Sequence, residues 1–171
     1  EVLGLTVLDE NGKSRVVTMG SYGIGVSRVL ASLAEENYDD RGLVWPAPVA
    51  PYDVDVVVAG KGDQLEAFAR ELAEDLDSTG LNVLLDDRRG VSAGVKFADS
   101  ELIGFPITVV VGRGLKDGKV ELRVRRSGER KDVPQELALI KVTKLHERLM
   151  VAAGSGEDAL FLEKLDQEGT I

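Results

Sequence analysis

Between residues 53 and 150, short apolar runs alternate with amphipathic helical stretches, and no other feature constrains the fold as strongly. The runs 54–58 and 107–111 consist mainly of β-branched residues, which is typical of strands buried on both faces of a sheet. Strands separated by crossover helices form a parallel sheet with helices packed on it. The pattern therefore predicts an α/β domain.

The predicted order of elements is β-α-β-α-β-β-β-α, a mixed five-stranded sheet with flanking helices. Strands are expected at 54–58, 81–85, 107–111, 120–124 and near 133, and helices at 63–80, 95–103 and from 134. Asp63 and Glu66 have the spacing of a capping box, so we expect Asp63 to cap the first of these helices. Ser127 and Gly128 favour a hairpin turn between the last two strands.

Residues before this domain follow a different pattern. Two β-like runs, 5–8 and 15–19, flank Asn11-Gly12, a pair that readily takes a type I′ turn, and predict a β-hairpin. A glycine-rich segment and a helical run that begins at Val26 come next. Three of the five prolines then fall within 46–51, and residues 38–51 are predicted to form an extended connector and a domain boundary. We expect three parts, which are a hairpin-and-helix piece with its connector at 1–50, the α/β domain at 51–152 and a tail at 153–171.

Composition excludes several classes of function. The chain has no cysteine and one histidine, so disulfides, thiolate metal sites and histidine clusters are not available. No apolar run approaches the roughly 18 residues that span a bilayer, so we expect a cytoplasmic protein with no membrane partner. The chain opens on Glu1 rather than methionine, from which we expect a piece of a longer protein. A net charge of -9 disfavours nucleic-acid binding through bulk attraction, so any such contact must be local.

The sharpest motif is Gly20-Ser-Tyr-Gly-Ile-Gly-Val-Ser-Arg28. Its glycines allow the backbone to approach a ligand closely, and Arg28 presents a planar fork of donors suited to phosphate oxygens. It is not a Walker loop, because Gly-Lys-Ser/Thr is missing, and Arg28 stands where the dinucleotide fingerprint needs a third glycine. Spacing alone leaves two interpretations open, a nucleotide site and a tight strand-to-helix turn with an exposed arginine.

A second constellation alternates acids and bases around one aromatic residue, Phe97. Its members are Asp86, Asp87, Arg88, Arg89, Lys96, Asp99 and Glu101. Carboxylates accept from the amino and imino groups of bases, arginine and lysine donate to O6, N7 or phosphate, and an aromatic ring can stack. The set is therefore suited to single-stranded bases. The alternative is a salt-bridged, solvated loop with Phe97 turned into the core.

Basic residues are concentrated further along the chain, against its acidic balance. They are Arg113, Lys116, Lys119, Arg123, Arg125, Arg126, Arg130 and Lys131. Such a patch can follow a nucleic-acid backbone, although charge on alternate strand positions also serves solubility alone. His146 is expected to be structural or exposed rather than catalytic, and Trp45 to pack the connector against a domain.

The stretch from Met19 to Arg28 resembles motif 3 of the class II aminoacyl-tRNA synthetases, and its sequence is close to that of the motif in bacterial prolyl-tRNA synthetases. The resemblance continues to about residue 150, through Trp45-Pro46, Ala50-Pro51, Asp86-Asp-Arg88, Gly94-Val-Lys-Phe-Ala-Asp99 and Glu101-Leu-Ile-Gly104. Several separated motifs in the right order are stronger evidence for the resemblance than any one of them. The resemblance implies that 51–152 is an anticodon-binding domain and that 1–50 is the end of an antiparallel catalytic domain.

The resemblance also implies roles for single residues. Arg28 would be the catalytic arginine that binds the terminal phosphate of ATP, and Gly23 and Gly25 would complete the ATP site beneath the adenine. Gly20 and Ser21 would line the amino-acid pocket, where the family usually has cysteine in place of Ser21. The expected anticodon contacts are Asp87, Arg88, Lys96 and Glu101. No residue is expected to bind a metal.

The implied activity is that of an aminoacyl-tRNA ligase, which activates proline with ATP and transfers it to tRNA(Pro). ATP and Mg²⁺ are the expected cofactors of a homodimeric full-length enzyme, and the isolated anticodon-binding domain would need none. Motifs 1 and 2 are not visible, so we expect this chain alone to be inactive. Two alternatives stay open, a stand-alone, non-catalytic module that binds tRNA or another RNA, and a related class II synthetase for threonine, histidine or glycine.

Overall fold

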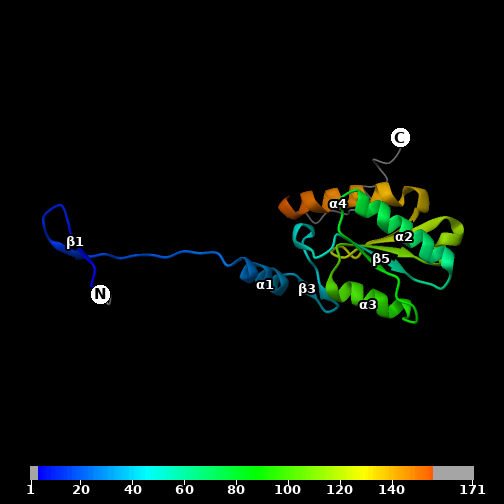
Figure 1. The fold of residues 1–171 in the computed structure, drawn as a ribbon, viewed down its shortest axis with the longest axis horizontal. Coiled ribbons are helices and arrows are strands. Elements are labelled where there is room, and N and C mark those ends of the chain that lie inside the picture. The colour runs from blue at the N-terminus through cyan, green and yellow to red at the C-terminus, as the bar shows by residue number, and fades with distance from the viewer. Residues whose placement is uncertain (1–3, 156–171) are drawn as a thin grey trace.

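A computed structural model describes residues 4–155, and the predicted elements follow one another in the expected order. Two parts stand apart in Figure 1, an α/β domain and, beyond helix α1, an extended stretch that ends in a β-hairpin. The predicted tail at 153–171 falls, after residue 155, outside the described residues. Across the described part of the chain, we find no helix that is both long and apolar enough to cross a membrane.

The α/β domain contains a five-stranded sheet with the strand order β6-β5-β7-β8-β9. Three strands are parallel, β5 (Val54–Val58), β6 (Val83–Asp86) and β7 (Ile107–Val111). Two more continue the sheet in the antiparallel sense, β8 (Lys119–Val124) and β9 (Arg130–Pro134). The prediction of a mixed five-stranded sheet with flanking helices is therefore confirmed.

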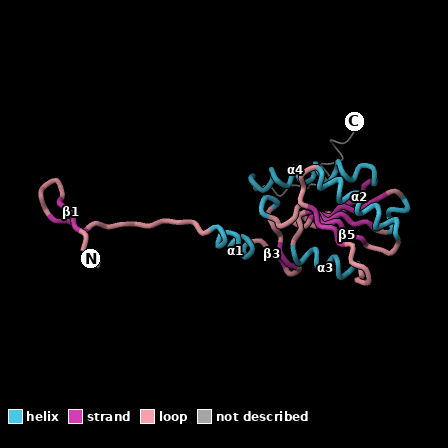
Figure 2. Tube along the Cα trace, viewed as in Figure 1, coloured by secondary structure: helices cyan, strands magenta, loops and turns pink. Residues whose placement is uncertain are grey.

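Helices cover both faces of this sheet (Figure 2). The helix α2 (Asp63–Ser78) joins β5 to β6 and lies with α4 (Ala138–Ser155) on one face. The helix α3 (Ala93–Ile103) joins β6 to β7 and lies on the other face. Successive strand residues point to opposite faces, so Val56 packs toward α2 and α4, whereas Asp55 points toward α3.

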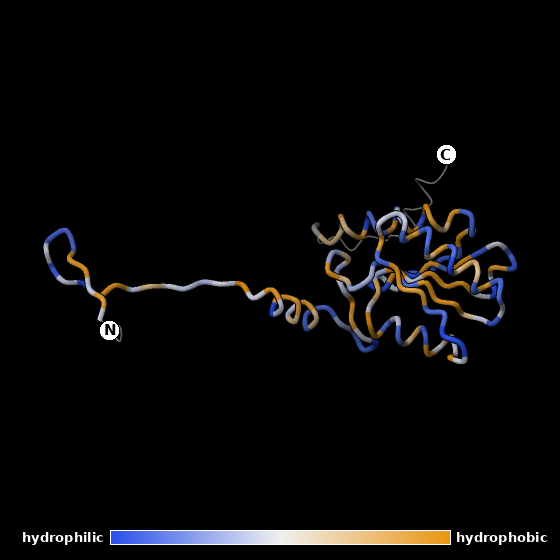
Figure 3. Tube along the Cα trace, viewed as in Figure 1, coloured by the Kyte–Doolittle hydropathy of each residue, from blue (hydrophilic) through white to orange (hydrophobic). Residues whose placement is uncertain are grey.

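The main core lies between the sheet and the pair α2 and α4. Figure 3 shows the strands as an apolar centre surrounded by more polar loops. Fully buried members include Val54, Val56, Leu76, Ile107, Val109, Leu122 and Leu145. Because helices cover both faces of β5 and β7, these strands carry β-branched residues at almost every position.

The start of α2 differs from the prediction. Gly62, not Asp63, is the N-cap, with φ at +141°, and no side chain caps the helix. Asp63 is the first helical residue, and the Glu66 carboxylate accepts from Arg89 Nη2 at 2.5 Å instead of returning to the helix start. The expected capping box is therefore wrong, because a glycine occupies the cap position and an ion pair engages the glutamate.

The first hairpin is present, but not with the expected turn. It is formed by β1 (Thr6–Leu8) and β2 (Ser14–Val16). A type I′ turn needs a positive φ at both central residues. Gly12 has a positive φ, at +72°, but Asn11 does not, because no described non-glycine residue has one. Instead, the Asp9 carboxylate accepts from the backbone N–H of Asn11 at 3.0 Å and determines the turn geometry.

The connector is not extended throughout. A second, short hairpin is formed by β3 (Tyr38–Asp39) and β4 (Gly42–Leu43), and Ala47–Val49 forms a 3₁₀ turn. The Asp39 carboxylate accepts from the backbone N–H of Arg41 at 2.8 Å and closes this hairpin. The prolines exclude the interior of an α-helix, but their φ also suits the first turn of a 3₁₀ helix.

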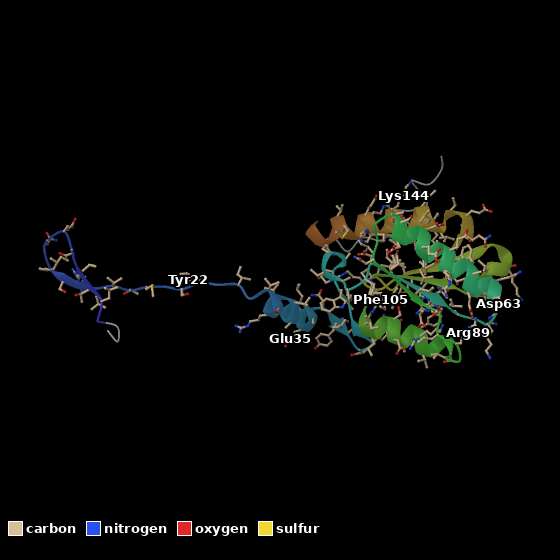
Figure 4. All side chains as sticks on the ribbon, in the orientation of Figure 1. Tyr22, Glu35, Asp63, Arg89, Phe105 and Lys144 are labelled. Atoms are coloured by element: carbon tan, nitrogen blue, oxygen red, sulfur yellow. The ribbon has the colours of Figure 1, made fainter. Side chains whose placement is uncertain are left out.

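The glycine-rich motif spans an extended stretch and the start of α1 (Val26–Glu36). Residues 17–25 have no regular structure, so the tight turn of the second interpretation is wrong, although its exposed arginine is present at Arg28. No residue of α1 is buried. Tyr22, on the extended stretch, lies away from the α/β domain (Figure 4).

Candidate functional site

A cavity of about 510 Å³ opens at the carboxyl ends of β5 and β6. The helices that follow these neighbouring strands lie on opposite faces of the sheet, so the two loops diverge and leave a crevice. The loop after β5 contributes Gly60, Lys61 and Gly62, and the loop after β6 contributes residues 87–92. Crevices at this edge are where open α/β sheets commonly bind ligands.

Arg88 stands at the rim of this cavity in a fixed orientation. Its Nε and Nη2 donate to the two carboxylate oxygens of Asp86 at 2.9 and 2.8 Å, and Nη2 also donates to Asp99 at 2.7 Å. The side chain is 48% exposed. Nη1 has no acceptor among residues 4–155, so its two N–H groups are available to a ligand.

Asp86 is held in its charged form. Burial alone would raise the pKa of its carboxyl, but hydrogen bonds from the Arg88 side chain and backbone outweigh this effect. The positive charge of Lys96 acts in the same direction, and the pKa of Asp86 is lowered. The rim of the cavity therefore carries a stable ion pair rather than two titrating groups.

Lys96 is buried beneath the cavity, with 3% of its side chain exposed. Its Nζ donates to the carbonyl oxygens of Val58 at 3.0 Å and of Asp86 at 2.9 Å. It lies 3.4 Å from Asp86 Oδ1 as well. To contact a base directly, this amino group would have to give up its hydrogen bonds to both carbonyl oxygens. The structure thus places Lys96 as a support that joins the ends of β5 and β6.

Three of the four predicted anticodon residues line this cavity, and the fourth does not. Asp87 lines it beside Arg88 and Lys96, and accepts from Arg70 at 2.9 Å. Glu101 lies elsewhere, since its carboxylate accepts from Arg41 of the connector at 3.0 Å.

The loop between β5 and α2 is a part of the site that sequence reasoning misses. Lys61 lies between two glycines, after a predicted strand and before a predicted helix. This position at the carboxyl end of a parallel strand is a signal that can identify such a loop. Lys61 is exposed, and its side chain has no hydrogen bond or ion pair within residues 4–155.

The fold divides the predicted basic patch. Arg113, Lys116 and Lys119 follow β7 at the same edge as the cavity, and their side chains have no partner in the described part of the chain. Arg125 and Arg126 instead contact the connector. The patch is therefore not one surface, and the free charges lie beside the cavity.

Three aromatic side chains do not line this cavity. Phe97 lies half-buried outside the main core, so the interpretation that it turns into the core is wrong, and the Arg123 guanidinium covers its ring at 4.0 Å from the centroid. The Trp45 indole donates to the carbonyl oxygen of Ile103 at 3.0 Å, which packs the connector on the domain as expected. His146 Nε2 lies 3.0 Å from Asp53 Oδ1, so this side chain makes a structural contact as expected.

The residues of the glycine-rich motif lie outside this cavity. Arg28 is exposed on α1 and has no partner among the described residues. Gly20, Ser21, Gly23 and Gly25 are exposed on the extended stretch. Within residues 4–155, no group of three or more His, Asp or Glu side chains could hold a metal ion. The two sets of predicted site residues therefore belong to separate parts of the chain.

Comparisons with known proteins cover most of the chain. A family model described as an anticodon binding domain matches residues 53–145. The proline–tRNA ligase of Paenarthrobacter aurescens (strain TC1) is 56% identical over 139 residues, which are 81% of this chain and 23% of that protein. The proline–tRNA ligase of Corynebacterium urealyticum is 56% identical over 144 residues, which are 84% of this chain and 24% of that protein. The chain thus spans about a quarter of the length of these curated relatives.

A solved structure has a similar fold. It is a prolyl-tRNA synthetase from Cryptosporidium parvum complexed with L-proline and AMP, and it matches with a TM-score of 0.67 at 24% sequence identity. The match covers 91% of this chain and 35% of that chain. At this identity the likeness shows the fold alone.

Proposed function

This chain belongs to the anticodon-binding domain family, and on that premise we propose that it is part of a proline–tRNA ligase. In this proposal the α/β domain reads the anticodon of tRNA(Pro), and residues 20–28 contribute to the ATP site. Identity of 56% to curated proline–tRNA ligases supports proline over threonine, histidine or glycine. The single observation that carries the reading role is the convergence of Asp87 and Arg88 on one cavity, which Lys96 supports from beneath.

The cavity offers complementary groups to an unstacked base. The Asp87 carboxylate can accept from an exocyclic amino group or a guanine imino group, and the free N–H groups of Arg88 can donate to a base carbonyl, N7 or phosphate. Arg88 is already oriented, because Asp86 and Asp99 hold its other nitrogen atoms. Little side-chain entropy is therefore lost when it binds.

The same edge carries cations that suit an RNA backbone. Lys61 follows β5, while Arg113 and Lys116 follow β7, the strand paired with β5. Phosphate contacts position an RNA, and base contacts supply the sequence information. A local cluster of this kind allows a chain with a net charge of -9 to bind nucleic acid.

Arg28 is proposed to act in the ATP site of the full-length enzyme. Its guanidinium is exposed and unpaired among the described residues, so it fits a phosphate anion. ATP bound there would supply the α-phosphorus that the proline carboxylate attacks, and Mg²⁺ would accompany the ATP. Arg28 stabilises the charge that moves onto pyrophosphate, while Gly23 and Gly25 leave room for the adenine. Gly20 and Ser21 border the amino-acid pocket.

The remaining partners follow from this assignment. The full-length enzyme would bind tRNA(Pro), proline and ATP, act in the cytoplasm where translation takes place, and form a homodimer. This chain contributes one wall of the ATP site, so alone it is expected to be inactive.

Binding of the isolated chain to tRNA(Pro) tests the reading role. Titrations at two salt concentrations compare tRNA(Pro) with the same tRNA carrying altered anticodon bases. One lost base contact costs about 1–3 kcal/mol, so the altered tRNA should bind about 5- to 150-fold more weakly at both salt concentrations. Lys13→Ala, in the β1–β2 hairpin, should leave binding unchanged. Weak binding that is indifferent to the anticodon would refute the role.

A further inference from the structure

The connector is held against the α/β domain by an ion pair that neither proposed site uses. Arg125 Nη1 and Nη2 donate to the two carboxylate oxygens of Asp39 at 2.7 and 2.6 Å. The Arg125 side chain is 5% exposed, and its Nε donates to the carbonyl oxygen of Glu101 at 3.2 Å. These hydrogen bonds from Arg125 hold the pKa of Asp39 well below its usual range. A bidentate pair has one favoured geometry, so it fixes orientation as well as distance.

Weaker contacts surround this pair on both sides. Arg126 Nη2 donates to Asn37 Oδ1 at 3.0 Å, and Arg41 Nη1 donates to Glu101 Oε1 at 3.0 Å. We call this set the connector clamp, and it consists of Asn37, Asp39 and Arg41 on the connector with Glu101, Arg125 and Arg126 on the domain. Two charged groups, Asp39 and Arg41, and one amide, Asn37, thus find partners on the domain.

Backbone packing makes the same contact rigid. A Cβ on Gly42, where φ is +143°, would lie 2.3 Å from Leu102 Cα. A Cβ on Gly104, where φ is +85°, would lie 2.3 Å from the carbonyl oxygen of Leu43. The connector and the end of α3 therefore approach so closely that only glycine fits at either position. This packing leaves the connector little freedom to tilt.

The connector clamp continues into helix α1 through Asn37. The backbone N–H and Nδ2 of Asn37 both donate to the carbonyl oxygen of Leu33, at 3.0 and 2.9 Å. Asn37 therefore closes the last turn of α1 while Arg126 holds its side-chain oxygen. Arg28 lies on this same helix, which leaves the domain beside β3 (Figure 1). The clamp thus sets the direction of α1.

We propose that the connector clamp fixes the anticodon-reading cavity relative to the ATP-site segment, with Asp39 and Arg125 as positioning residues for transfer of proline to tRNA. This inference rests on the proposed function. A tRNA bound by its anticodon presents its far end to the ATP-site segment only if the angle between the two parts is set. Misplacement by about 1 Å can cost about 100-fold in rate. The clamp residues Asp39 and Arg125 do not line the anticodon cavity, so their loss should spare anticodon binding.

Asp39→Ala in the full-length enzyme tests the proposal. We expect kcat for charging of tRNA(Pro) to fall by about 10- to 100-fold. The KM for tRNA, proline-dependent ATP–pyrophosphate exchange and affinity for an anticodon stem-loop should stay within about twofold. Asp39→Glu, which keeps the carboxylate, should recover part of the rate. Asp40→Ala is the matched control, because Asp40 is adjacent, exposed and without a partner in the described residues.

A glycine insertion covers the case in which Asp39→Ala does not fold. Two glycines between Asn37 and Tyr38 leave the Asp39–Arg125 pair in place but uncouple α1, and should cause the same selective loss of kcat. Normal charging by the insertion variant would overturn the proposal, as would an equal loss of charging, exchange and stem-loop affinity. If the unaltered enzyme does not charge tRNA(Pro), the proposed function is refuted, and the role of the clamp with it.

Discussion

Replacement of the buried acid Asp55 should change how the stability of the chain depends on pH. Asp55 is 2% exposed on β5, and its Oδ1 has no hydrogen-bond partner among the described residues. Burial raises the pKa of its carboxyl to about 6, and the charge of Asp86 adds to the rise, whereas a hydrogen bond with Ser100 opposes it. The acid therefore ionises within the range in which proteins are usually studied.

Asp55 binds its proton more tightly in the folded chain than in the unfolded chain. Its folded-state pKa of about 6 lies above the ordinary 3.8, so between these values the folded chain carries more protons. The stability contributed by the neutral acid is complete below about pH 4 and is lost as the pH rises through about 6. At about 1.4 kcal/mol per pH unit, the loss reaches about 3 kcal/mol by about pH 8. Asp55→Asn removes the ionisation and hence this loss.

Urea unfolding between about pH 4 and pH 8 measures the effect. The free energy of unfolding of Asp55→Asn, relative to the unaltered chain, should rise by about 3 kcal/mol across this range, whatever its offset at low pH. Other titrating groups cancel in the difference. Asp117→Asn, which changes an exposed acid without a partner in the described residues, should give a flat difference. A flat difference for Asp55→Asn as well would refute the reasoning.

Three further predictions concern the connector, the ATP site and the RNA backbone. Gly42→Ala should lower the free energy of unfolding by about 2 kcal/mol or more, because its new Cβ would lie 2.3 Å from Leu102 Cα. The control Gly118→Ala, at φ +68° in open space, should lower it by only about 1 kcal/mol. Equal losses would contradict the close packing at Gly42. Arg28→Ala in the full-length enzyme should lower proline-dependent ATP–pyrophosphate exchange by orders of magnitude, and near-normal exchange would exclude the phosphate role. Lys61→Ala should reduce the slope of log affinity for tRNA(Pro) against log salt by about 0.7 to 0.9, and an unchanged slope would exclude a phosphate contact there.

The regular elements of the α/β domain are predictable because their signals are local. β5 and β7 begin and end where the apolar runs 54–58 and 107–111 do, since both faces of these strands are covered. Gly104 ends α3 in the left-handed conformation, with φ at +85°, which a side chain would disfavour. The local spacing of apolar residues and the helix-ending glycines thus identify the sheet, its crossover helices and the loop that carries Asp87 and Arg88.

The contacts of the long charged side chains are not predictable in the same way. Lys96 has the residue type of a base contact, yet one of its acceptors, the carbonyl oxygen of Val58, is 38 residues away in the chain. Arg125 belongs by sequence to a basic patch, yet its partner Asp39 is 86 residues away. A local pattern carries no information about which distant acceptor a flexible side chain reaches. The sequence therefore indicates which loops form the site, but not which of their charges face a ligand.

Hydrogen exchange of the chain with and without tRNA(Pro) tests most directly the claim that the carboxyl edge of β5 and β6 reads the anticodon. Backbone amides at 60–66 and 86–92 should exchange more slowly when tRNA(Pro) is bound, and altered anticodon bases should weaken this protection. The β1–β2 hairpin should exchange equally in both states. Protection confined to residues 123–131, or protection that does not depend on the anticodon, would contradict the account.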